Sequence, residues 1–166
     1  MVDKFTNVAE VTGRMAVQNA FPGRRSRQSL LMVPWCTFCD PEIAHIGLHV
    51  WDARERGIPV RTITIMMQDV DRAIVDGQDH GFVKIHLKEG TDQILGSTIV
   101  ASRASDMINE ISAVMSAGMG MRDLANVLHI YPAQSDAIRQ AALTYVRDEP
   151  RFGGVRMASG SVRSSP

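Results

Sequence analysis

The sequence predicts an α+β fold, a largely antiparallel sheet with helices packed on it, and three observations support this. Residues 82–88 alternate polar and apolar side chains, as a half-buried strand does. A polar turn at 89–92 and an apolar segment at 94–100 complete an antiparallel hairpin. Residues 104–117 then form the clearest helix, because apolar side chains recur there at helical spacing, namely Met107, Ile108, Ile111, Val114 and Met115.

The segments before the hairpin alternate between helical and extended patterns. Asn7 is suited to cap a helix that runs through about Ala20, where Phe21, Pro22 and Gly23 end it. We expect the strand at 60–67 to be covered on both faces, because both sets of alternating residues are largely apolar after Arg61. The other predicted segments are strands at 30–33, 35–38 and 43–48 and short helices at 50–56 and 69–75.

The segments after the long helix are short and end in a second amphipathic stretch. A short helix is predicted at 121–127, and Pro132 stands where a helix can begin, since its missing N–H group costs nothing there. The apolar stripe of the last helix consists of Ile138, Ala141, Ala142, Tyr145 and Val146. Residues 149–166 are rich in Gly, Ser and Arg and are expected to form a disordered tail.

Composition narrows the classes of partner. A chain of 166 residues can bury one sizeable core. Lys+Arg and Asp+Glu both total 18, which argues against nucleic acid as the main partner, and the basic run at 23–27 is read as a solvated turn. No apolar run approaches the roughly 20 residues that cross a bilayer, and the N-terminus lacks a signal-peptide pattern. We therefore expect a cytoplasmic protein without a membrane partner.

Cys36 and Cys39 form a Cys-x-x-Cys pair, which supports an alternative reading as a stand-alone small redox or metal protein. A redox pair needs its first sulfur at a helix N-terminus, whereas the flanking residues here are typical of a strand. The sequence has no second Cys/His pair at zinc-ligand spacing, and His45, His49 and His80 are scattered. We expect buried, inert thiols that form no disulfide with each other, and no metal site.

Three groups of motifs, in the right order, resemble the C-terminal interface domain of the class I pyridine nucleotide–disulfide oxidoreductases. The first is Asp-Pro-Glu-Ile-Ala at 40–44, followed by Gly47. The second is Gly-Phe-Val-Lys at 81–84 with Ile-Leu-Gly-Ser-Thr-Ile-Val at 94–100. The third comprises 107–110, 123–125 and His-Ile-Tyr-Pro-Ala-Gln-Ser-Asp at 129–136, where the family usually has His-x-His-Pro-Thr-x-Ser-Glu.

The resemblance implies a division of the chain and a set of cofactors. Residues 1–29 would be the remnant of an FAD-binding domain, leaving its helix before an interface domain at 30–148. The parent enzyme would bind FAD and NAD(P), and the implied FAD contacts here are Thr6, Asn7, Ala9 and Pro132. The chain contains neither the Gly-x-Gly-x-x-Gly fingerprint nor the family's redox cysteine pair, so we expect it to bind no cofactor and to be inactive alone.

The function that the resemblance implies is homodimerisation. Tyr131 and Asp136 would act in trans, at the flavin and disulfide of the partner subunit. A tyrosine with an ordinary pKa near 10 is a poor base at pH 7, but it can form a hydrogen bond. The apolar faces of 104–117 and 134–147 would meet their two-fold copies. The expected interface residues are Met107, Ile111, Met115, Met119, Met121, Ile138 and Tyr145.

Two further readings follow from the same residues. Tyr131 and the Trp-Cys-Thr run at 35–37 resemble the mercuric-reductase-like branch more than dihydrolipoamide dehydrogenase or glutathione reductase, although residues 153–166 contain no cysteine. A weaker alternative is a regulator that caps full-length subunits in an inactive heterodimer.

Overall fold

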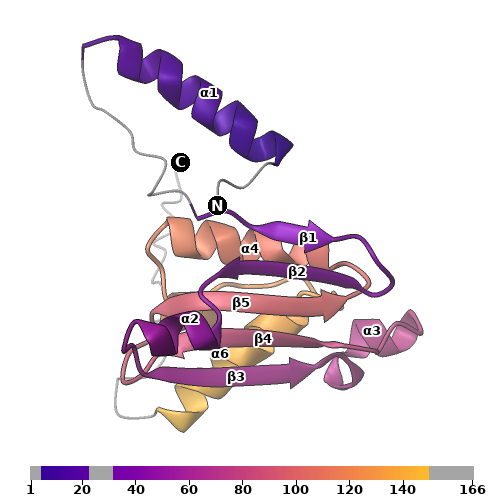
Figure 1. Ribbon diagram of the computed structural model, residues 1–166. Helices are drawn as coiled ribbons and strands as arrows, with labels where there is room; N and C mark the ends of the chain where they lie inside the picture. Colours follow the sequence, from indigo (N-terminus) through magenta and orange to yellow (C-terminus); the bar gives the residue numbers. More distant parts are fainter. Residues whose placement is uncertain (1–4, 23–31, 150–166) are drawn as a thin grey trace, which may run out of the picture.

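The computed structural model describes residues 5–22 and 32–149, and over these residues the chain forms one antiparallel sheet with helices (Figure 1). The sheet has five strands in the order β1-β2-β5-β4-β3, and each neighbouring pair is antiparallel. The strands are β1 (Trp35–Thr37), β2 (Glu42–Gly47), β3 (Val60–Met66), β4 (Phe82–Lys88) and β5 (Ile94–Ala101). The predicted α+β class and the hairpin at its centre are confirmed.

The helices are α1 (Thr6–Ala20), α2 (Val50–Glu55), α3 (Asp71–Val75), α4 (Ala104–Ser116), α5 (Met121–Ala125) and α6 (Asp136–Asp148), with a 3-10 turn η2 (Met67–Asp69) before α3. Figure 1 shows α4 and α6 on one face of the sheet, with α4 against β2 and β5 and α6 against β3 and β4. Helix α1 stands apart from this layer, and Val8 is its buried residue. No helix in the described residues is long and apolar enough to cross a membrane.

Strand register explains how the core forms. The side chains that face α4 and α6 fall into rows across neighbouring strands, because opposite residues of an antiparallel pair point to the same face. One row joins Ala44, Ile99, Val83 and Ile65, and the next joins Ile46, Ser97, Ile85 and Ile63. All except Ile65 are buried, and they pack against the apolar faces of the two long helices.

Two glycines of the hairpin motif are required by close backbone approaches. Gly81 has φ +113°, and a Cβ atom there would lie 1.9 Å from the carbonyl oxygen of Val100. A Cβ atom at Gly96 would lie 2.3 Å from the carbonyl oxygen of Leu48. Any side chain at either position would force strand β5 away from its neighbours. This explains why glycine begins the motif at 81–84 and interrupts the motif at 94–100.

Several local predictions were wrong, each for a physical reason. Strand β3 is an edge strand with α6 on one face only, so Thr62, Thr64 and Met66 are exposed rather than covered on both faces. Pro132 does not begin a helix: it follows Tyr131 through a cis peptide bond, and α6 begins four residues later. Helix α1 begins before Asn7, whose Oδ1 atom accepts a hydrogen bond from the next backbone N–H instead of capping.

Other predictions fall partly or wholly outside the described residues. In the segment predicted as a strand at 30–33, residues 32 and 33 are described and are not in a strand. The basic run at 23–27 and the tail beyond residue 149 are not described.

Glu42 on β2 links the sheet to the start of α4. Its Oε2 atom accepts a hydrogen bond from the backbone N–H of Ser105 at 2.8 Å, in the first turn of a helix whose own N-cap residue, Arg103, provides no side-chain acceptor. A carboxylate at this position satisfies a backbone donor that the helix leaves unpaired and interacts favourably with the helix dipole. The glutamate of the Asp-Pro-Glu-Ile-Ala motif therefore has a structural role, which is to fix α4 on the sheet.

We predict that Glu42→Ala lowers the free energy of unfolding by about 1 kcal/mol, the usual cost of losing a helix cap. Glu42→Gln, which keeps an acceptor oxygen without the charge, should cost less. Equilibrium urea unfolding measures both, with Glu89→Ala in the exposed β4–β5 turn as the control. An unchanged midpoint for Glu42→Ala would show that the cap contributes nothing.

Two buried imidazoles lie on the sheet face opposite the long helices. The Nδ1 atom of His45 lies 2.9 Å from the Thr98 hydroxyl and its Nε2 atom 3.1 Å from the Gly47 carbonyl, while the Nδ1 atom of His86 lies 2.9 Å from the Thr62 hydroxyl. Burial lowers the pKa of each to about 4, with further lowering by the charge of His49 at His45 and of Lys84 at His86. Both imidazoles are therefore neutral at physiological pH.

The ring of His45 also belongs to an aromatic stack. Its centroid lies 3.6 Å from that of His49, which in turn lies 4.2 Å from Trp51. The ring of Trp35 is tilted relative to that of His45, with 5.7 Å between the two ring centroids. Protonation of His45 would place a positive charge inside this stack. Its Nδ1 atom could then no longer accept a hydrogen bond from the Thr98 hydroxyl.

We predict acid destabilisation between pH 6.5 and pH 4. The unfolded chain binds protons at His45 and His86 in this window and the folded chain does not, so stability is complete above the unfolded pKa and falls as pH falls. The loss should reach about 1–3 kcal/mol for each histidine. Urea unfolding at pH 7.5 and pH 5 tests this, and His86→Gln should reduce the difference while His80→Gln, at an exposed site, should not. A pH-independent midpoint would contradict it.

Candidate functional site

Tyr131 lies in the loop between α5 and α6, just before the cis peptide bond to Pro132, and 68% of its surface is exposed. Its hydroxyl donates a hydrogen bond to the Oδ2 atom of Asp71 at 2.5 Å. Asp71 is the first residue of α3, sixty positions away in sequence, so the contact joins two separate parts of the fold. This bond and the negative charge of Asp71 raise the pKa of Tyr131, which keeps the phenol protonated.

Asp136 is the first residue of α6 and is only 6% exposed. Its two carboxylate oxygens accept hydrogen bonds from the Nε atom of Arg139 at 2.6 Å and from the Nε2 atom of Gln140 at 2.9 Å. Burial by itself would raise the pKa of Asp136, but these two donors and the positive charge of Arg139 lower it overall. The carboxylate of Asp136 is thus an anchor at the start of α6, and the carboxylate bonded to Tyr131 is that of Asp71.

The loop around Tyr131 is fastened on both sides. His129 precedes it, with its Nε2 atom 2.6 Å from the Oε1 atom of Glu110 on α4. Gln134 follows it and is buried, since its Oε1 atom accepts from the Ser102 hydroxyl at 3.0 Å and its Nε2 atom donates to Asp76 and Gln78 at 3.3 Å each. These contacts hold Tyr131 and Pro132 between two fixed points.

A cavity of about 390 Å³ opens beside this loop. Its lining has charges of both signs and comes from Arg72 and Asp76 at the two ends of α3, from Arg103 and the first half of α4, and from residues 132–135. Arg72 in its wall is already paired with Asp76, with 2.9 Å between the Nε and Oδ1 atoms. Pro132, one of the implied flavin contacts, forms part of this wall.

The other implied flavin contacts lie elsewhere. Thr6, Asn7 and Ala9 are exposed on the first turn of α1. Thr6 and Asn7 line a second cavity of about 380 Å³, which also touches Cys36 and Ser105. Pro132 belongs to the first cavity, so the structure does not gather the four residues into one pocket.

Most of the expected interface residues are buried within the chain itself. The reason is that the apolar faces of α4 and α6 cover their own sheet, so their side chains have no free surface for a second copy. The buried residues are Met107, Ile111, Met121, Ile138 and Tyr145, and only Met115 and Met119 keep part of their surface exposed.

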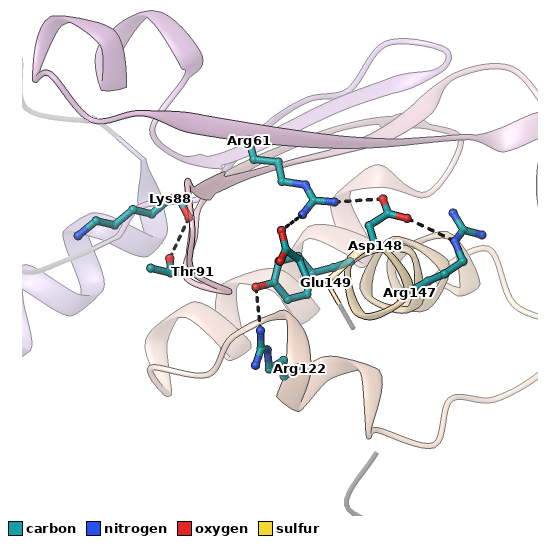
Figure 2. A network of polar contacts seen from close by, with 8 residues as sticks. Arg61, Lys88, Thr91, Arg122, Arg147, Asp148 and Glu149 are labelled. Atoms are coloured by element: carbon teal, nitrogen blue, oxygen red, sulfur yellow. Dashed lines mark hydrogen bonds and ion pairs between the residues drawn. The ribbon is translucent and has the colours of Figure 1, made fainter. Parts of the chain in front are cut away.

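Tyr145 shows how closed this packing is. The guanidinium groups of Arg61 and Arg122 each lie 5.5 Å from the centre of its ring, and Arg122 also donates to its hydroxyl at 3.3 Å. Figure 2 shows Arg61 reaching from β3 to the end of α6, where it pairs with Asp148 at 3.0 Å and Glu149 at 2.9 Å. The predicted interface tyrosine is instead a bridge between β3, α5 and α6.

Exposed apolar side chains gather in the loop before Tyr131. Leu128 is 97% exposed and Ile130 is 80% exposed, and Val127 next to them is also exposed. These residues lie outside the helix faces from which the interface was predicted. The available signal was an apolar run, Val127 to Ile130, interrupted only by a histidine in a segment without helical or strand periodicity.

Cys36 and Cys39 are both free thiols. Cys36 is half-buried on β1, whereas Cys39 is exposed in the following turn, so the prediction of two buried thiols is wrong for Cys39. Burial raises the pKa of Cys36, as do the charges of Glu42 and Cys39, which makes the reactive thiolate scarcer. Within the described residues, no group of three or more His, Cys, Asp or Glu side chains could hold a metal ion.

We predict that Cys36 reacts slowly with iodoacetamide at pH 7 in a Cys39→Ser variant, because its raised pKa leaves little thiolate. The alkylation rate should rise only in alkaline solution, and mass spectrometry of the wild-type chain should show no Cys36–Cys39 disulfide. The same variant in denaturant serves as the control for an unperturbed thiol. A rapidly reacting Cys36 at neutral pH under native conditions would contradict the prediction and support a redox role.

Comparison with known proteins agrees with this architecture. Residues 33–142 match the family model described as pyridine nucleotide-disulphide oxidoreductase, dimerisation domain. The chain is 31% identical over 144 residues to a mercuric reductase of Streptomyces lividans, covering 87% of this chain and 30% of that protein. It is 32% identical over 127 residues to a dihydrolipoyl dehydrogenase of Mycoplasma pneumoniae, covering 76% of this chain and 28% of the relative.

Solved structures show the same fold. The crystal structure of LpdA from Mycobacterium tuberculosis superposes with a TM-score of 0.80 at 30% identity, covering 87% of this chain and 31% of that one. The flavoprotein disulfide reductase RclA from Escherichia coli, in a Cu(II) complex, gives 0.78 at 24% identity over 86% of this chain and 33% of its own, a likeness of fold alone. The chain spans about 30% of the length of the relatives it matches. Since the matched family model extends over most of the chain, this protein belongs to the pyridine nucleotide-disulphide oxidoreductase dimerisation-domain family.

Proposed function

We propose that this chain is the homodimerisation domain of an FAD-dependent NAD(P)H–disulfide oxidoreductase. The observation that supports the proposal best is the exposed apolar loop formed by Val127, Leu128, Ile130 and Tyr131. Clustered exposed apolar side chains of this size mark interaction surfaces, because leaving them in water forgoes the free energy of burial. The match to a dimerisation-domain family supports a second copy of the chain as the partner.

The loop is the centre of the proposed interface, and the partly exposed Met119 extends it toward α4 and α5. A two-fold axis near this loop would bring the same side chains of both subunits together, as isologous interfaces do. The buried faces of α4 and α6 would support the loop from beneath without touching the partner. This revises the interface predicted from sequence while keeping its function.

The proposed domain boundary falls between α1 and β1. Only Val8 of α1 is buried, so the helix contributes little to the core that begins at β2. This supports an assignment of 1–29 to the end of an FAD-binding domain and of 30–148 to the interface domain. Further residues of a longer protein would hold FAD and NAD(P), with Thr6, Asn7, Ala9 and Pro132 as additional contacts.

In a dimer of such a longer protein, Tyr131 and Asp136 would serve the partner's redox site in different ways. Tyr131 is exposed on the interface loop and can reach across it, whereas Asp136 is buried and fixes the helix behind it. Tyr131 would therefore provide the contact in trans and Asp136 its support. The isolated chain would be inactive, because further residues of the longer protein would bind the flavin and provide the redox disulfide. The cytoplasmic location stays a prediction.

We predict that the chain is dimeric at ~20–50 μM by light scattering coupled to size exclusion, since a stable interface buries roughly 800 Å² on each partner. Leu128→Glu with Ile130→Glu should weaken dimerisation by at least about tenfold in Kd, equivalent to about 1.4 kcal/mol. Val17→Glu, at an exposed apolar position on α1, is the matched control and should leave the dimer intact. A monomeric wild-type chain, or a double variant that dimerises normally, would refute the proposed interface.

A further inference from the structure

We propose that Asp71 is the positioning residue for Tyr131: it takes the hydroxyl hydrogen and so leaves the phenolic oxygen to act outward as a hydrogen-bond acceptor. The inference builds on the proposed function, in which Tyr131 faces a partner subunit. It assigns a role to a residue outside the motif at 129–136, at the start of helix α3.

The observation behind the proposal is the hydrogen bond from the Tyr131 hydroxyl to the Oδ2 atom of Asp71. The distance of 2.5 Å between the Tyr131 and Asp71 oxygens is that of a charge-assisted O–H···O⁻ bond. A carboxylate can only accept, so the hydrogen must lie on Tyr131 and point toward α3. Asp71 begins α3 directly after the buried Val70, which fixes its backbone to the core.

Tyr131 is placed to meet this carboxylate by the anchors of its loop. His129 is bound to Glu110, and Gln134 is bound to Ser102 and Asp76, so neither end of the segment is free to turn the ring away. The bond to Asp71 then sets the remaining rotation of the hydroxyl. Tyr131 is 68% exposed, and its hydroxyl oxygen has two lone pairs that can accept a hydrogen bond.

The two carboxylates near the Tyr131 phenol both raise its pKa. Asp71 approaches from α3, and Asp136 contributes its negative charge from the start of α6. Both disfavour a tyrosinate, because that anion would lie beside two carboxylates. The Asp136 oxygens accept hydrogen bonds from Arg139 and Gln140, whereas the Tyr131 hydroxyl donates to Asp71. The expected ligand group is thus one that donates a hydrogen bond, such as a thiol, and keeps its proton.

The ionisation of Tyr131 provides a direct readout, because the chain has only two tyrosines. In a Tyr145→Phe background, the rise of absorbance at 295 nm with pH reports Tyr131 alone. Asp71→Asn removes the charge and the strong acceptor, so the titration midpoint should move to lower pH. Asp71→Glu should restore it in part, and Asp69→Asn, an exposed carboxylate without this bond, should leave it unchanged.

Equal midpoints for the wild-type and Asp71→Asn phenols would overturn the proposal. If Tyr145→Phe does not fold, the difference between the titrations of the full chain and of Tyr131→Phe isolates the same group. Circular dichroism at each pH confines the comparison to the folded range. The titration does not depend on dimerisation, which light scattering measures separately, so a failed Asp71 pairing and a failed interface give different results.

Discussion

The fold depends on one constraint, which is that a single face of the sheet must be covered by two helices. The rows of side chains from Ala44 to Ile65 and from Ile46 to Ile63 are apolar apart from Ser97, and α4 and α6 bury them. Because the apolar stripes of both helices pack inside the chain, a surface for a partner must come from other segments. The loop between α5 and α6 is one such segment, and it contains Leu128, Ile130 and Tyr131.

The elements that were predicted well are those in which local pattern and tertiary packing agree. The alternation at 82–88 matches the observed burial of Val83, Ile85 and Leu87, and the helix predicted at 104–117 is observed at Ala104–Ser116. The order of the family motifs was informative because Glu42, Gly81 and Gly96 each meet a physical demand of the same sheet. Local sequence therefore sufficed wherever the fold requires a particular residue for a nearby reason.

The candidate site was harder to predict because its contacts join distant segments. Nothing near Tyr131 in sequence indicates that its hydrogen-bond partner is Asp71. A helical stripe also shows only that one face is apolar, not which surface covers it, so it does not reveal that Met121 and Ile138 are buried within the chain itself. In both cases the missing information was tertiary proximity, which β-sheet order and loop path determine.

The fastening of the loop between His129 and Gln134 has a consequence for the energetics of association. Ordering a flexible loop on binding costs conformational entropy, about 0.5–1.5 kcal/mol for each side chain that is immobilised. Here the backbone on both sides is tied to α4 and α3 before any partner arrives, through Glu110 and Asp76. A second subunit would meet Ile130 and Tyr131 already in position, so preorganisation would let a modest contact area give a durable complex.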